Sequence, residues 1–323
     1  MFLYNTLPMD SLPPLVSIGL CVRNGAEYLQ GALDSLLNQT YKNLELVISD
    51  NASTDGTREI CEEYAKHDKR IRYIRQKENI GSYGNYDFIR KETRGDYFTW
   101  AACDDFWDPR FVEKSITRFK EVPGASMVFP NFCAFDESGR IMKLIPEKYF
   151  PFDQNIYGRV KSYILNKTEN GKITMIYGLW KRHAPADQIS LGDCHGDMIY
   201  MLRTLLAGYF ANVPEALFFK REPLQVSAEA TGEKPSLNLL TKIPPEKYEN
   251  IDKWHETRGE IEKKLEWRNP VKIFIANRIQ STKYLYKISV CILKSPDLNA
   301  SQKLRLCLWT FYAYLKALWC GYM

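Results

Sequence analysis

Two adjacent carboxylates, Asp104 and Asp105, directly follow an apolar run that begins at Tyr97. If this run is a buried strand, the two charges repel each other in a poorly solvated place. A divalent cation relieves that repulsion, and Mg²⁺ or Mn²⁺ is commonly held by one or two carboxylates together with substrate phosphates. We therefore predict a metal site at Asp104 and Asp105, where the ion would neutralise a diphosphate leaving group. The alternative is that Asp105 or Asp108 caps the helix that Pro109 is predicted to open.

Further polar residues follow the first two predicted strands. Asp50 comes just after the apolar run 44–48, where its carboxylate could accept a hydrogen bond from a nucleotide base or could simply hold a turn. Asn24 and Glu27 stand where the first helix is predicted to begin, and helix N-termini bind phosphates. They are therefore candidates for holding a nucleotide, although Glu27 could also serve as a favourable charge in a first helical turn.

Asp197 stands at the start of an apolar segment with helical spacing. An Asp with a reference pKa of about 3.9 is ionised at neutral pH and can act as a general base within hydrogen-bond reach. We predict that Asp197 deprotonates an acceptor hydroxyl, with Asp193 as the rival candidate and a helix N-cap as the alternative role. His183 and His195 have no Ser or Cys partner at a recognisable spacing, so a hydrolytic triad is not supported.

The elements that must position these residues alternate along the first 130 residues. Apolar residues at a period of two predict strands, and apolar residues spaced by three and four predict helices. Strands are predicted at 16–22, 44–48, 71–74, 97–101 and 125–129, and helices at 28–37, 57–67, 83–93 and from Pro109 onward. Such alternation predicts a mostly parallel, twisted sheet covered by helices on both faces. Ligands bind outside the carboxyl ends of such strands, which is where Asp50 and Asp104 fall.

Beyond Pro130 the pattern predicts turns, then a strand over 173–180 and a helix over 196–208. We divide the chain into four parts on this basis. They are an N-terminal extension (1–13), an α/β domain (14–226), a linker (227–250) and a basic helical C-terminal region (251–323).

Charge and cysteine usage narrow the class of protein. The 323 residues carry a formal charge of +5, which does not indicate nucleic-acid binding. Residues 271–323 hold eight Lys or Arg against one acid, so this tail is +7 and the rest of the chain is −2. The eight cysteines are scattered without a Cys-x-x-Cys pair, which favours a reducing cytoplasm over a zinc site or a disulfide framework. The N-terminus lacks signal-peptide features, and no apolar run reaches the length of about 18 residues that a membrane span needs.

Aromatic and basic residues are mixed within residues 304–319, where Trp309 and Phe311 lie near Arg305 and Lys316. Such a composition suits a membrane interface, where cations meet anionic lipid. The alternatives are a helix that docks on its own domain or on a partner, including a second copy of the chain. We therefore expect a cytoplasmic protein, with peripheral contact at the inner face of a membrane as one interpretation of the tail.

These motifs, in this order, resemble those of the inverting family 2 glycosyltransferases of GT-A fold. The resemblance covers residues 14–222 and rests on Val16 to Gly25, Ala32 to Tyr41, Leu44 to Gly56, Asn79-Ile80-Gly81 with Asn85, Tyr177-Gly178-Leu179, Asp197, and Val213 to Leu217 with Arg221. It implies a GT-A type α/β fold. It also implies one in-line displacement, with inversion, that moves a hexosyl or N-acetylhexosaminyl group from a nucleotide-diphosphate donor, usually UDP-linked. The implied acceptor is a hydroxyl of a glycan or lipid-linked saccharide in polysaccharide biosynthesis.

The same resemblance implies a role for each candidate residue. Asp50 would contact the base of the donor, Asp104 with Asp105 would bind Mn²⁺ or Mg²⁺, and Asp197 would be the base. The remainder of the donor pocket would be lined by Val22, Asn24, Glu27, Asn79, Asn85 and Arg221.

Two positions depart from the family pattern. Ala102 replaces the first Asp of an Asp-x-Asp motif, so the metal would rest on Asp104 with help from Asp105, or metal dependence would be weaker. Arg221 is followed by Glu222 where a His is often found, which puts phosphate binding by this loop in question.

Two other functions stay open: a catalytically degenerate domain that binds a partner, and a nucleotidyltransferase. The turn from Val22 to Gly25 holds a single glycine, which argues against a nucleotidyltransferase. It also excludes the Gly-x-Gly-x-x-Gly loop of dinucleotide-binding proteins.

Overall fold

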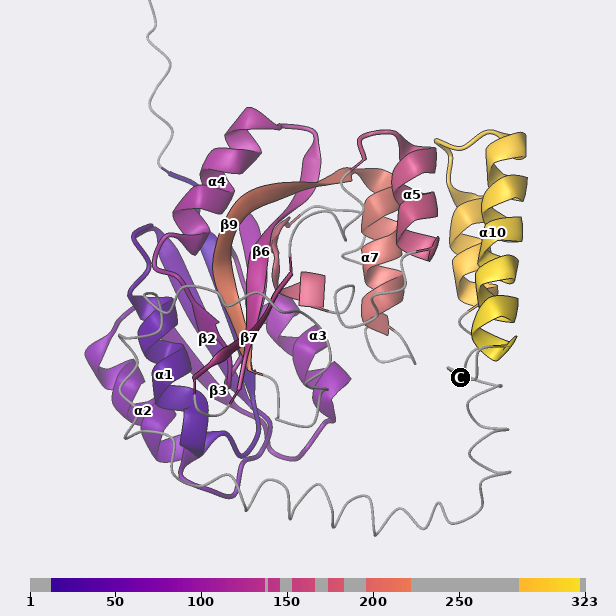
Figure 1. Cartoon of the computed structure of the whole chain (residues 1–323). Coiled ribbons are helices and arrows are strands. Elements are labelled where there is room, and N and C mark those ends of the chain that lie inside the picture. Colours follow the sequence, from indigo (N-terminus) through magenta and orange to yellow (C-terminus); the bar gives the residue numbers. More distant parts are fainter. Residues whose placement is uncertain are drawn as a thin grey trace, which may run out of the picture.

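The structure, a computed structural model, describes residues 13–136, 139–145, 153–165, 174–182, 196–221 and 285–319. Within these residues, nine strands form one sheet in the order β3-β2-β1-β4-β8-β6-β9-β5, with β7 paired to β6. Figure 1 shows α1 and α2 on one side of this sheet and α3 on the other. The predicted α/β class, with helices on both faces, is confirmed.

The first half of the sheet is parallel. It consists of β1 (Val16–Val22), β2 (Leu44–Asp50), β3 (Ile71–Arg75) and β4 (Tyr97–Ala102), with β1 at its centre. Every residue of β1 is buried, as expected for a strand covered on both faces. The register sets Val22 beside Asp50 and Cys21 beside Ala102, so the three strands end at one edge.

Helices of this half follow the predicted spacing closely. They are α1 (Ala26–Leu37), α2 (Thr57–His67), α3 (Ser82–Glu92) and α4 (Phe111–Glu121). The predicted start of α4 was wrong, because Pro109 lies two residues before its first turn. Asp108 holds that turn outside the helix: its carbonyl accepts from the N–H of Phe111 (3.0 Å) and its Oδ1 from the N–H of Arg110 (2.8 Å).

The second half of the sheet is mixed. It consists of β5 (Phe106–Trp107), β6 (Ala125–Phe135), β7 (Ile141–Ile145), β8 (Leu179–Lys181) and β9 (Tyr209–Arg221). Strand β8 is antiparallel to both β4 and β6, whereas β6 and β9 are parallel.

Two predictions for this half were wrong. Strand β6 continues through Pro130, where turns were predicted, because its register with β9 shifts at Pro130 and an irregularity tolerates the missing N–H. The predicted strand over 173–180 is mostly a 3₁₀ turn, η2 (Met175–Tyr177), and only its end joins β8. A short buried apolar run does not by itself distinguish a strand from a buried turn.

The remaining helices form layers beside the sheet. Helix α7 (Gly196–Ala207) confirms the helix predicted there, and α5 (Ile156–Leu165) packs against it. Helix α10 (Ala300–Trp319) then packs on α5 (Figure 1). A helix over 285–294 contacts α7, where Nε of Arg203 donates to Cys291 Sγ (3.5 Å). No helix among the described residues is long and apolar enough to cross a membrane. The predicted extension, apart from residue 13, and the linker lie outside the described residues.

Candidate functional site

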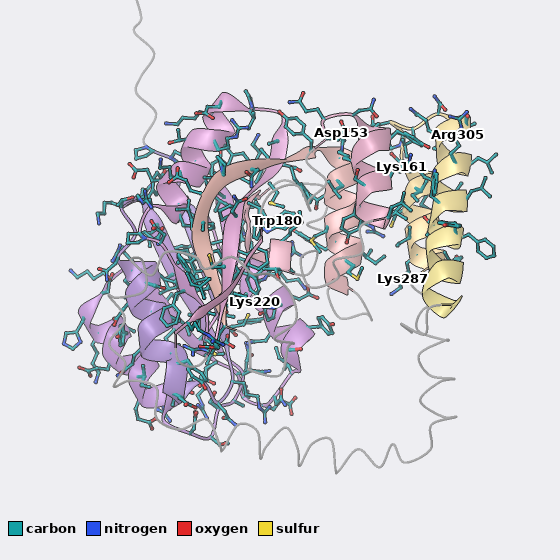
Figure 2. The ribbon with its side chains drawn as sticks, in the orientation of Figure 1. Asp153, Lys161, Trp180, Lys220, Lys287 and Arg305 are labelled. Atoms are coloured by element: carbon teal, nitrogen blue, oxygen red, sulfur yellow. The ribbon has the colours of Figure 1, made fainter. Side chains whose placement is uncertain are left out.

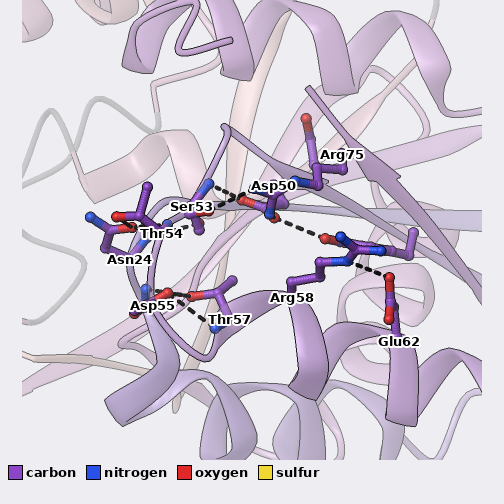
Figure 3. A network of polar contacts seen from close by, with 12 residues as sticks. Asn24, Asp50, Ser53, Thr54, Asp55, Thr57, Arg58, Glu62 and Arg75 are labelled. Atoms are coloured by element: carbon purple, nitrogen blue, oxygen red, sulfur yellow. Dashed lines mark hydrogen bonds and ion pairs between the residues drawn. The ribbon is translucent and has the colours of Figure 1, made fainter. Parts of the chain in front are cut away.

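Two loops meet at the carboxyl ends of β1 and β2, as the close view in Figure 3 shows. The N–H of Asn24 donates to Ser53 Oγ (2.9 Å), the N–H of Thr54 donates to Asn24 Oδ1 (2.8 Å), and the N–H of Gly25 donates to Thr57 Oγ1 (2.9 Å). Asn24 has a φ of 51°, a left-handed conformation that Asn tolerates better than most residues. The amides that open α1 are therefore already bonded within the chain. A phosphate at this turn would have to replace those bonds.

Asp50 is fully buried beneath these loops. Its Oδ1 accepts from the N–H of Ser53 (2.8 Å), and its Oδ2 accepts from the hydroxyl of Tyr73 (2.8 Å) and from Nη1 of Arg75 (2.7 Å). An ionised carboxylate has about four acceptor positions, of which these donors take three. Asp50 thus holds the turn, as the alternative interpretation expected, and keeps acceptor capacity for one further donor.

Three asparagines tie the start of α3 to the end of β2. Nδ2 of Asn51 donates to Asn79 Oδ1 (2.9 Å), and Asn51 Oδ1 accepts from the N–H of Ile80 (2.9 Å). Asn85 is 3% exposed and makes two hydrogen bonds with Ser49, one to its carbonyl oxygen and one from its hydroxyl. Asn85 therefore lies beneath the loop and positions it, whereas Asn79 lies at its surface.

Asp104 and Asp105 follow β4 at the same edge. Asp105 is 3% exposed, and its Oδ1 accepts from the N–H of Arg221 (2.9 Å). Burial raises the pKa of both carboxyls, and the neighbouring charge of Asp104 raises the pKa of Asp105 further. The capping interpretation fits Asp108, which bonds the turn before α4, and not Asp105.

Arg221, the last residue of β9, packs directly on this pair. Its Nε donates to the carbonyl oxygen of Asp104 (3.2 Å). Its guanidinium carbon lies 4.5 Å from the ring centre of Tyr28 and 4.8 Å from that of Phe135. Cations over aromatic faces are favoured, the more so when desolvated, and Arg221 is only 7% exposed. The sheet therefore fixes a positive charge beside the two carboxylates.

The loops after β1 and β4 also touch. A Cβ on Gly25 would lie 2.7 Å from Cys103 Sγ, so only glycine allows this approach. Asp50 ends β2, and Asp104 lies in the turn that follows β4. These two strands lie on either side of β1, about 10 Å apart, or two strand spacings. The predicted residues of β1, β2 and β4 are thus brought to one edge.

A divalent ion fits this edge only in part. The described residues hold no group of three or more His, Cys, Asp or Glu that could bind a metal. A cation that shares its ligands with substrate phosphates needs only one or two carboxylates. Asp104 and Asp105 meet that requirement, although one oxygen of Asp105 is already bonded to Arg221.

Other predicted residues are placed less directly. Val22 is 2% exposed, and its carbonyl oxygen accepts from the N–H of Asn51 (2.9 Å). Glu27 is exposed in the first turn of α1. Asp197 is the second residue of α7, but its side chain lies outside the described part of the chain, as does Asp193. Because α7 ends directly before β9 begins and packs on it, the first turn of α7 lies toward the end of the sheet where β9 finishes (Figure 1).

Tyr73, Arg75 and Tyr28 were not predicted. Tyr73 and Arg75 lie two residues apart on β3, so they share one face beside Asp50. That spacing, two polar residues on one face of a strand next to an acidic strand end, is a signal that the sequence does carry. Tyr28 carries no such signal, because its contact with Arg221 joins α1 to the distant β9.

A cavity of about 340 Å³ lies elsewhere, lined by Asp96, Tyr97, Gly124, Ala125, Ser126, Lys181, Arg182, Ala207 and Gly208. These residues stand where β4, β6 and β9 begin and where the antiparallel β8 ends. Ligands of such sheets bind at the opposite ends of the strands, so this cavity is not the expected donor pocket.

The sequence profile of glycosyl transferase family 2 matches residues 17–210. The chain belongs to this family. An uncharacterized glycosyltransferase of Haemophilus influenzae is 38% identical over 104 residues, 32% of this chain and 32% of the relative. Glycosyltransferase GlyA of Streptococcus pneumoniae is 30% identical over 168 residues, 51% of this chain and 23% of the relative. The putative glycosyltransferase EpsE of Bacillus subtilis is 34% identical over 139 residues, which are 42% of this chain and 50% of the relative. The family 2 chain thus spans at most half the length of these relatives.

Solved structures share the fold of this family 2 chain at low sequence identity. TarS 1–349 of Staphylococcus aureus aligns with a TM-score of 0.60 and 13% identity, covering 93% of this chain and 72% of TarS. The same protein in complex with UDP-GlcNAc aligns with a TM-score of 0.59 and 14% identity, covering 93% of this chain and 72% of TarS. This likeness confirms the predicted GT-A type architecture.

Proposed function

We propose that this family 2 chain transfers a sugar from a UDP-sugar donor to a hydroxyl of a glycan or lipid-linked saccharide, with inversion. The main support for this proposal is that Asp50, Asp104 and Arg221, from distant parts of the sequence, lie at one edge of the sheet. The donor class is supported by TarS, which shares the fold and has been solved with UDP and with UDP-GlcNAc.

Donor binding is divided among the strand ends. Asp50 is fully buried, so the loops that cover it must open before its remaining acceptor position can receive an N–H of the base. Arg75 and Tyr73 hold the carboxylate in place. Arg221 and the neighbouring Lys220 attract the diphosphate, as cations beside phosphate oxygens do. Val22, Asn24, Glu27 and Asn79 line the pocket, and Asn85 positions the loop.

Asp104, with help from Asp105, would hold Mn²⁺ or Mg²⁺ when the donor supplies phosphate oxygens. The ion would neutralise charge on the departing diphosphate. Buried carboxyls with raised pKa values suit this role, because a divalent charge stabilises their ionised forms. Ala102 contributes no ligand, so the substrate must complete the coordination.

Transfer itself is a single displacement. The acceptor oxygen forms a bond to the anomeric carbon while the bond from that carbon to the phosphate oxygen breaks. The nucleoside diphosphate leaves with the electron pair, and the proton of the acceptor hydroxyl passes to the Asp197 carboxylate. The assignment of Asp197 rests on its sequence position at the start of α7.

Calorimetric titration with UDP-, GDP- and dTDP-sugars, with and without Mn²⁺, tests donor binding. We expect Asp104→Ala to weaken the metal-dependent part of UDP-sugar binding at least about tenfold, which is about 1.4 kcal/mol. Asp108→Ala is the matched control, because Asp108 belongs to the same segment but bonds Arg110. Equal metal-dependent affinity in the Asp104→Ala variant and the wild type would contradict the metal assignment.

Asp197→Asn tests the base separately. We expect it to keep donor binding but to lower the rate of transfer about 10²–10⁴-fold, the usual contribution of a general base. Asp193→Asn is the control and the rival. If Asp193→Asn alone abolishes transfer, the base is misassigned. If wild type neither binds nor hydrolyses any donor, the chain is the degenerate, partner-binding domain.

A further inference from the structure

Helix α10 has two different apolar faces. Its inner face buries Leu306 and Thr310 (0% and 4% exposed) in the direction of α5. Its outer face carries Leu304, Leu308 and Phe311, which are 61%, 59% and 50% exposed. At 3.6 residues per turn, these three positions share one side of the helix, roughly opposite Leu306. The packing of the described residues therefore explains the inner face and leaves the outer face exposed.

Exposed apolar side chains gather on this helix pair. Among the described residues, six of the eight large apolar side chains that are exposed belong to it: Tyr286, Leu293, Leu304, Leu308, Phe311 and Tyr312. We call these six residues the outer patch. Scattered exposed apolar residues need no explanation, but a concentration of them marks an interaction surface.

Basic residues border the outer patch. Lys294 directly follows Leu293, and Lys303 and Arg305 flank Leu304 in the sequence, whereas the tail 271–323 holds a single acid, Asp297. Arg305 lies at the outer edge of the molecule (Figure 2). A second copy of the same surface would bring like charges together, which disfavours self-association. An anionic, apolar surface complements both the charge and the patch.

We propose that the outer patch of the helix pair rests on an anionic lipid bilayer, with α10 lying in the plane of the interface. Helices with an apolar face, basic borders and aromatic residues bind in this way without spanning the membrane. Tyr286 and Tyr312 suit this position, since Tyr has an apolar ring and a polar hydroxyl. The proposal concerns where the chain docks and does not depend on the proposed sugar transfer.

Flotation of the full chain with vesicles tests the proposal. We expect binding to vesicles of phosphatidylcholine mixed with phosphatidylglycerol, weaker binding to phosphatidylcholine alone, and loss of binding as salt rises. Leu308→Ser with Phe311→Ser should weaken binding by about a hundredfold or more, because the variant no longer buries these two apolar side chains in the bilayer. Lys303→Gln with Arg305→Gln should weaken it by about thirtyfold.

A matched control removes the same charge elsewhere. Lys66 and Lys69 are exposed at the end of α2, so Lys66→Gln with Lys69→Gln should leave vesicle binding unchanged. The outer-patch variants remove exposed side chains, so their thermal unfolding should match the wild type. The proposal is overturned if the wild type does not float with anionic vesicles, or if the control weakens binding as much as Lys303→Gln with Arg305→Gln. It is equally overturned if Leu308→Ser with Phe311→Ser only converts a dimer to a monomer.

Discussion

Asp105 is a carboxylate whose ionised form the fold disfavours in the absence of a cation. Its folded pKa is raised well above the unfolded value of about 3.9 by burial and by Asp104. A raised folded pKa means that the stability this group contributes is fully present below the unfolded pKa. That stability is lost as the pH rises through the folded pKa. The wild type should therefore lose stability across this window.

Asp105→Asn removes that loss while keeping an oxygen for the N–H of Arg221. We expect the variant to match the wild type at the acid end of the window and to have the higher free energy of unfolding at neutral pH. Urea unfolding at a series of pH values, with a chelator present, measures the difference. Added Mn²⁺ should reduce it, because the ion would stabilise the wild-type pair. A variant less stable than the wild type at neutral pH would show that the fold already compensates both charges.

At this scale the sequence predicted the acidic strand ends but not their partners. Asp50 and Asp104 are visible because each follows an apolar run. The spacing of Tyr73 and Arg75 is visible in the sequence, but their contact with Asp50 depends on the order of the strands. Tyr28 reaches Arg221 through the packing of α1, for which the sequence carries no signal. These contacts are made between segments far apart in the chain, which local periodicity does not encode.

The loop between β2 and α2 stores local strain. Ala52 has a φ of 57°, a left-handed conformation that costs a residue with a Cβ roughly 1–2 kcal/mol. Ala52→Gly should relieve this cost, but glycine also gives the unfolded chain more conformational entropy, which offsets part of the gain. The net effect should be a rise of about 0.5–1 kcal/mol in the free energy of unfolding. Urea unfolding of the variant and the wild type measures this difference in the free energy of unfolding.

Asn24→Gly is the matched comparison, since Asn24 has a similar φ of 51°. Its side chain accepts from the N–H of Thr54 at 2.8 Å, and losing that bond should cost about 1 kcal/mol. Opposite signs for the two variants are expected. If both destabilise the chain equally, the strain at Ala52 is not stored in the folded state.

At the scale of helices and strands, segments with a regular apolar period were predicted well, whereas segments in which that period is interrupted were not. Strands β1 to β4 and helices α1 to α3 carry clear periods of two or 3.6, so their bounds were predicted to within a few residues. Strand β6 and η2 were misread because Pro130 sits at a register shift and because the apolar run before Gly178 folds as a turn. In both places tertiary packing decides between conformations that the same sequence pattern allows.

At the scale of the whole molecule, the structure shows what the C-terminal tail contacts within the chain. The sequence left docking on its own domain and contact with a membrane as alternatives. The structure shows that α10 docks on α5 while a separate face stays exposed, so the two are compatible. A basic amphipathic pattern does not reveal that a helix has two apolar faces with different neighbours.

The helix pair should be separable from the proposed donor site. Ile292 is fully buried against the main core, so Ile292→Asp places an uncompensated charge there, at a cost of about 3–5 kcal/mol. We expect the pair to undock from α5 and α7, which it contacts, and to become sensitive to limited proteolysis. UDP-sugar binding should persist, since Asp50, Asp104 and Arg221 lie on the sheet. Leu293→Asp, at a neighbouring position that is 55% exposed, should change neither property. Loss of donor binding in Ile292→Asp with cooperative unfolding would show instead that the helix pair and the sheet fold as one unit.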